Sequence, residues 1–110
     1  MTEFLFVLDQ VASEKCFLLD FLNNDIKWEE IVSLPTGLYG GNMEYIDGYF
    51  YVLGGLVTKD ELNYKVYRLD TYQWDSLEWI EFDVLNEAYY STGSTNNKQD
   101  IFIAPGYISF

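Results

Sequence analysis

Short apolar runs separated by polar turn residues recur along the chain, a pattern that is typical of β-strands. The clearest run is Tyr49–Leu53, which follows the turn signal Asp47-Gly48 and ends at Gly54-Gly55. Glycine favours a tight hairpin here because it adopts positive φ without a clash of Cβ. From residue 79 to 84, apolar and acidic residues alternate with period two, as in a strand with one buried face.

The same reasoning predicts an all-β fold for the rest of the chain. Further strands are expected at 4–8, 15–22, 28–32, 38–45, 64–70, 87–91 and 101–104. Polar segments at 56–63 and 92–99 are expected to form a loop and a turn. A helix over 17–31 is disfavoured because Asn23-Asn24-Asp25 interrupts it.

A repeat of about 51 residues underlies this pattern. Trp28 and Trp79 open matching segments, each with an apolar residue three positions later and an equivalent Leu six positions later. The same offset places residues 51–55 on 102–106, and residues 16–20 match 66–70 at an offset of 50. The recurring unit is therefore about four strands long.

These units resemble the kelch repeat of β-propellers. The resemblance rests on Ile46-Asp47-Gly48, on Gly54-Gly55, on the 66–70 strand and on Trp79-x-x-Phe82-x-x-Leu85. It implies antiparallel four-stranded blades within a single all-β unit over 1–110: a partial blade at 1–35, a complete blade at 36–86 and a partial blade at 87–110.

The terminal repeats depart from the kelch pattern. Asp9-Gln10 and Pro105-Gly106 stand where the glycine pair is expected, and Trp74 is a rival to Trp79 as the motif tryptophan. Propellers have about four to eight blades, so two blades' worth of strands leaves edges and apolar faces uncovered. The chain could be a piece of a longer propeller, a subunit of a closed ring, or a compact sandwich or partner-capped sheet. We expect a homo-oligomer or part of a larger assembly.

Composition narrows the possible functions. The formal charge of −12 repels phosphate backbones and argues against direct nucleic-acid binding. The sequence has no His, which removes the common zinc and His-dependent catalytic sites, and Cys16 is expected to be a buried structural thiol. Paired carboxylates can catalyse glycoside hydrolysis without His, but no pair is singled out by its spacing, so we expect no enzyme activity. No phosphate loop or calcium loop is present, so we expect no cofactor and no metal. A cytoplasmic location is expected, with no membrane association.

The stretch from Asp70 to Glu87 combines acidic and aromatic residues and contains no Lys or Arg. The leading hypothesis is a non-enzymatic protein-interaction or scaffold module that holds a basic partner protein at an acidic, aromatic face. The alternative is a small acidic inhibitor that mimics nucleic-acid charge, of the phage antidefence type; a merely solvated strand face also remains open. Candidate partner-binding residues are Asp60, Glu61, Tyr72, Trp74, Asp75, Glu78, Glu81 and Asp83.

Overall fold

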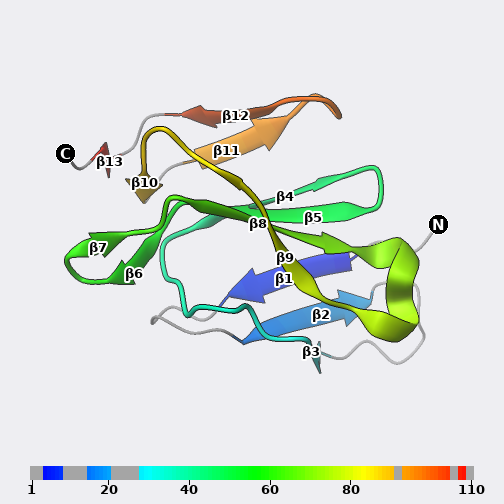
Figure 1. Ribbon diagram of the computed structural model, residues 1–110. Helices are drawn as coiled ribbons and strands as arrows, with labels where there is room; N and C mark the ends of the chain where they lie inside the picture. The colour runs from blue at the N-terminus through cyan, green and yellow to red at the C-terminus, as the bar shows by residue number, and fades with distance from the viewer. Residues whose placement is uncertain (1–3, 9–14, 21–27, 91–92, 105–106, 109–110) are drawn as a thin grey trace.

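The computed structural model describes residues 4–8, 15–20, 28–90, 93–104 and 107–108, which form antiparallel sheets and one short 3-10 helix (Figure 1). The all-β prediction is confirmed. The central sheet has the order β4-β5-β8-β9, so each of its strands pairs with its neighbour in sequence apart from the excursion between β5 and β8. Its strands are β4 (Asn42–Ile46), β5 (Tyr49–Leu53), β8 (Lys65–Asp70) and β9 (Trp79–Val84).

Smaller sheets flank the central sheet. The first sheet has the order β1-β2-β3, and β11 pairs with β12 as a separate hairpin. The remaining elements are β1 (Phe4–Leu8), β2 (Cys16–Asp20), β3 (Trp28–Ile31), β6 (Leu56–Thr58), β7 (Glu61–Leu62), η1 (Thr71–Ser76), β10 (Tyr89–Tyr90), β11 (Gly93–Asn96), β12 (Ile101–Ala104) and β13 (Tyr107–Ile108).

Two polar segments differ from the sequence-based expectation. The predicted loop at 56–63 contains the hairpin β6-β7, whose turn lies between Thr58 and Glu61. The predicted turn at 92–99 contains β11, which pairs with β12 over its whole length. The sequence did not reveal these three strands, because β6 and β7 are only three and two residues long and β11 consists of small and polar residues. The strand expected at 38–45 begins only at Asn42, and the expected turn at 23–25 lies outside the described residues.

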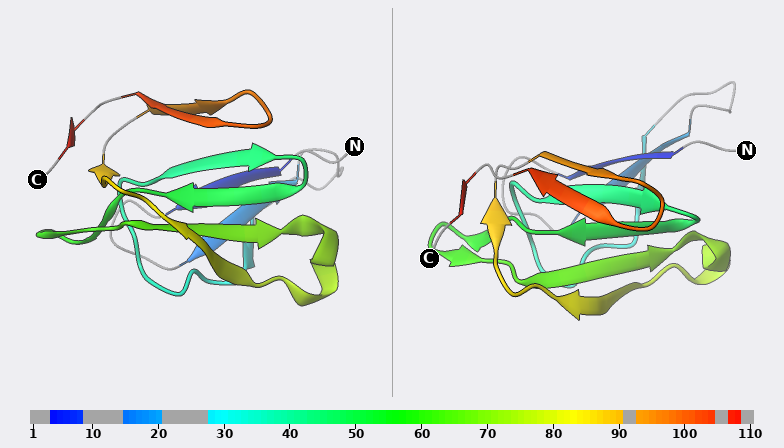
Figure 2. Two further views of the ribbon diagram at one scale, coloured as in Figure 1. Left: turned by 45° about the horizontal axis from the view of Figure 1, so that its top comes forward. Right: turned by 90° about the horizontal axis from the view of Figure 1, so that it is seen from above.

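The sheets form layers, with the central sheet between the first sheet and the β11-β12 hairpin (Figure 2). The inner face of the central sheet, defined by Phe50, Val52, Tyr67, Leu69 and Trp79, packs against the first sheet and the segment that follows it. That opposing surface is supplied by Cys16, Ile31, Val32, Leu34 and Leu38. The Trp79 indole N–H also donates to the carbonyl of Val32 at 3.1 Å, which satisfies its polar atom inside the core.

The β4-β5 turn depends on Asp47 and Gly48, which both have positive φ, at 49° and 89°. The ring of Tyr72 lies where a Cβ at Gly48 would be placed, so glycine is required by contact as well as by conformation. Thr71 reinforces the same contact because its backbone N–H and its hydroxyl both donate to the carbonyl of Gly48. The hairpin turn and the start of η1 are therefore fixed against each other.

At the other end of the sheet, Asn63 joins three backbone groups where the chain leaves the β6-β7 hairpin. Its side-chain amide donates to the carbonyls of Gly54 and Lys65, both at 2.9 Å, and its oxygen accepts from the N–H of Lys65 at 3.0 Å. Asn63 is only 3% exposed, so water does not readily replace these bonds.

Replacing Asn63 by Asp should lower the free energy of unfolding by about 2–4 kcal/mol, because a carboxylate then faces two carbonyl oxygens with no donor between them. Asn86→Asp is the matched control: it makes the same charge change at an exposed position and should shift stability by less than about 0.5 kcal/mol. Urea unfolding of both variants measures the difference. Equal stability of the two variants would show that the Asn63 bonds contribute nothing.

Candidate interaction surface

The structure separates the eight candidate residues into groups. Asp60 and Glu61 lie on the β6-β7 hairpin, at the opposite end of the central sheet from η1 (Figure 1). Tyr72, Trp74 and Asp75 lie on η1, and Glu78 lies in the short link to β9. Only the second group forms a compact surface. The remaining two, Glu81 and Asp83, lie on β9.

Asp70 begins the η1 segment. Its carboxylate accepts a hydrogen bond from the N–H of Tyr72 at 2.8 Å, which caps the 3-10 helix. No η1 side chain is buried; Tyr72 is 72% exposed and Trp74 is 43% exposed. Two large aromatic side chains therefore stand at the surface beside several carboxylates, an arrangement that aromatic-anchored interfaces use.

A pocket of about 280 Å³ lies beside η1. It contains the carboxylates of Asp70 and Glu78 and the guanidinium of Arg68, and so has an excess of one negative charge. Its apolar wall is Ile80, which is 40% exposed. The remaining lining residues are Gln73 and Ser76. A basic side chain could lay its aliphatic stem on Ile80 and direct its charge to the two carboxylates.

Arg68 also belongs to an aromatic cluster on the outer face of the central sheet, the face opposite the core. Its guanidinium carbon lies 4.6 Å from the ring centroid of Tyr49 and 4.3 Å from that of Phe82. Tyr51 meets Phe82 edge-on at 5.6 Å, and Tyr72 meets Tyr49 edge-on at 6.0 Å. The buried Nε of Arg68 has no hydrogen-bond partner within the described chain. Stacking on two rings therefore takes the place of an ion pair.

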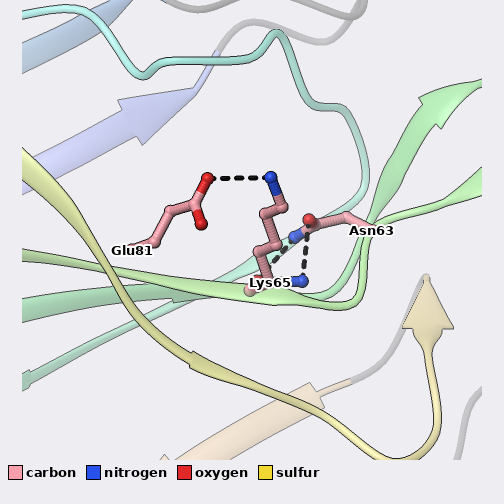
Figure 3. A network of polar contacts seen from close by, with 3 residues as sticks. All are labelled: Asn63, Lys65 and Glu81. Carbon is pink, nitrogen blue, oxygen red and sulfur yellow. Dashed lines mark hydrogen bonds and ion pairs between the residues drawn. The ribbon is translucent and has the colours of Figure 1, made fainter.

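Glu81 and Asp83 are engaged locally. Glu81 accepts from the ammonium of Lys65 at 2.8 Å, next to the Asn63 bonds (Figure 3). This hydrogen bond raises the pKa of Lys65, but both side chains are about half exposed, so water screens the pair. Asp83 accepts from the N–H of Val84 at 2.8 Å. These two acids are less suited to hold a partner than Asp75 and Glu78.

Sequence reasoning missed Arg68, Asp70, Gln73, Ser76 and Ile80 as lining residues of the pocket. A signal for Arg68 was present, because it is the single arginine of the chain and lies between Tyr67 and Leu69 in a predicted strand. The pocket itself was not foreseeable because η1 turns Gln73 and Ser76 back beside β8, and no apolar periodicity marks a 3-10 turn with an exposed surface.

The described residues contain no cluster of metal-ligating side chains. Among them, no three acidic, Cys or His side chains gather closely enough to hold a metal ion. Cys16 is completely buried, as predicted, and burial raises the pKa of its thiol from 9.0 to about 11. The reactive thiolate is therefore a very small fraction of Cys16 near neutral pH.

No protein-family model matches the chain, and no curated protein matches it significantly. Within the described residues, no helix has the length and apolar character needed to cross a bilayer.

Cys16 should react with an aromatic disulfide reagent at pH 8 at least about a hundredfold more slowly in the native protein than in denaturant, because it is both inaccessible and protonated. The control Cys16→Ala/Ser33→Cys moves the thiol to an exposed neighbouring position and should react at the rate of a free thiol. Because the native pKa is raised, the Cys16 rate should still be increasing above pH 9. Fast native labelling would contradict the packing of the first sheet on the central sheet.

Proposed function

We propose that the chain is a non-enzymatic protein-interaction module that binds a basic segment of another protein at the surface formed by η1 and the start of β9. The observation that carries the proposal is the pocket in which the carboxylates of Asp70 and Glu78 lie beside the apolar wall of Ile80. Exposed Tyr72 and Trp74 lie on the same short helix as the lining residues Gln73 and Ser76 and supply aromatic contact area. Interfaces commonly combine such anchors with charge complementarity.

The chemistry favours Lys or Arg as the residue recognised. Both carry an apolar stem that can cover Ile80 and a cation that the two carboxylates attract. The guanidinium of Arg stacks on exposed rings such as that of Trp74 more readily than the ammonium of Lys does. The overall charge of −12 assists by steering basic partners toward the protein.

We also propose that the β4-β5-β8-β9 sheet is one kelch-like blade and that the chain is a partial propeller completed by assembly with further blades. The meander order of this sheet supports the proposal, as does its position between two other antiparallel layers. The 51-residue repeat supports it from the sequence. In this arrangement the η1 segment lies at one end of a blade, where a partner reaches it without disturbing the stacked faces.

The binding site can be tested with a short fluorescent oligoarginine peptide as the probe. Asp75→Asn/Glu78→Gln should weaken binding by roughly tenfold or more, because it removes two carboxylates at η1. The matched control Asp60→Asn/Glu61→Gln makes the same charge change on the distant hairpin and should weaken binding by less than about threefold. Fluorescence anisotropy at constant ionic strength measures both. Equal losses, or no binding by the unaltered protein, would overturn the proposed site.

Trp74→Ala should weaken peptide binding by roughly tenfold, and this loss should persist at moderate salt because an aromatic contact is not screened. Tyr64→Ala is the control, since Tyr64 is similarly exposed at the far end of the sheet. If salt alone abolishes binding and Trp74→Ala has no effect, the acidic mimic of nucleic-acid charge becomes the better description.

A further inference from the structure

Equivalent positions of the repeat show how one sheet covers the next. In the first sheet, Cys16 pairs with Ile31, and paired residues point to the same face. Both side chains enter the core against the inner face of the central sheet, around Tyr67 and Trp79. The outer face of the first sheet is therefore buried by the sheet that follows it.

The outer face of the central sheet occupies the equivalent place but is covered on one side only. The β11-β12 hairpin packs against β4, where Glu44 accepts from Ser94 at 2.5 Å and from the amide of Asn96 at 2.8 Å. Toward β9 the cover ends: Phe82, which the repeat aligns with half-buried Ile31, is 47% exposed. The aromatic cluster around Arg68 is therefore the part of the outer face that the β11-β12 hairpin leaves uncovered.

The inner face of the first sheet is also partly exposed. Trp28 is the repeat equivalent of Trp79, yet it is 48% exposed, whereas Trp79 is 5% exposed because the preceding sheet covers it. Glu30 lies on the same face as Trp28, and Phe17 is its neighbour across the strand pair. The first sheet therefore exposes its inner face and the central sheet part of its outer face, whereas the two faces between these sheets are buried against each other.

We propose that a second copy of the chain docks its Trp28 face on the Phe82 face of the first, so that copies stack head to tail through two different surfaces. The Trp28 face carries the carboxylate of Glu30, and the Phe82 face carries Arg68, so the two surfaces are complementary in charge as well as apolar. The internal packing of the first sheet on the central sheet supplies the precedent.

Repulsion between copies opposes this association, because each carries a formal charge of −12. Screening by salt should therefore strengthen self-association, whereas the binding of basic peptide at η1 should weaken with salt. The inference rests on the proposed stacking of blades but not on the basic partner. Sedimentation therefore tests the association of copies, and peptide binding tests the η1 site, so either proposal can fail alone.

Two single variants test the head-to-tail geometry by sedimentation velocity at moderate salt. Trp28→Ser removes the aromatic contact of one surface and Phe82→Ser removes that of the other. Each variant alone should therefore be monomeric, while the unaltered chain associates. An equimolar mixture should form a dimer and no larger species, because each variant retains the surface that the other lacks. Tyr64→Ser, which removes an exposed aromatic elsewhere, should associate like the unaltered chain.

The circular dichroism spectrum of the folded protein should be retained by both variants, since both side chains are about half exposed. Arg68→Glu should weaken association at least about tenfold, and adding Glu30→Arg to the same chain should recover most of that loss. A monomeric unaltered chain, self-association by either single variant, or a mixture that stays monomeric would each overturn the proposal.

Discussion

Burial of the inner face of the central sheet against the first sheet is the interaction on which the rest of the structure depends. An antiparallel sheet of four strands needs one covered apolar face to be stable, and Tyr67, Leu69 and Trp79 supply that face. Replacing a buried large aromatic by Ala typically costs about 3–5 kcal/mol, so the two aromatic residues carry a substantial share of a domain's net stability. Trp79 also ties β9, the outermost strand, to the carbonyl of Val32, so the edge is held through its side chain.

This covered face determines what the opposite face can be. Residues alternate along β8, so Tyr67 and Leu69 enter the core while Arg68 points outward. An outward Arg between the rings of Tyr49 and Phe82 keeps its stem and guanidinium plane in apolar contact without an ion pair in the described chain. Such a face is more apolar than an ordinary solvated surface. It also carries the guanidinium of Arg68, which can pair with a carboxylate of another molecule. The same side chain lines the pocket next to η1, so the two proposed surfaces share a boundary.

The strands β5 and β8 could be predicted because each buries alternate or consecutive apolar side chains, and this leaves a periodic signal in the sequence. The alternation in β9 predicted the strand but not its burial, because Ile80, Phe82 and Val84 are exposed and only Trp79 is buried. The strands β6, β7 and β11 could not be predicted, because β6 and β7 are only three and two residues long and β11 consists of small and polar residues. The candidate surface was located only in part. Exposed Tyr72 and Trp74 follow from the composition of the segment, but the separation of Asp60 from them depends on the direction in which the chain leaves Gly55.

That direction is set by backbone geometry that no pattern of hydrophobicity encodes. Gly54 and Gly55 both have positive φ, and Gly55 lies close to the backbone of Tyr39 and Gly41, so the chain turns away from the sheet at this point. Asn63 then returns it by bonding to Gly54 and Lys65. The excursion between β5 and β8 thus moves two acidic residues to the end of the sheet opposite η1. Acidic residues are consequently present at both ends of the sheet as well as on β9, where Glu81 and Asp83 lie. In the two proposed interactions, the charge of −12 repels other copies and attracts a basic partner, so salt would favour the assembly of copies and weaken the capture of a basic partner.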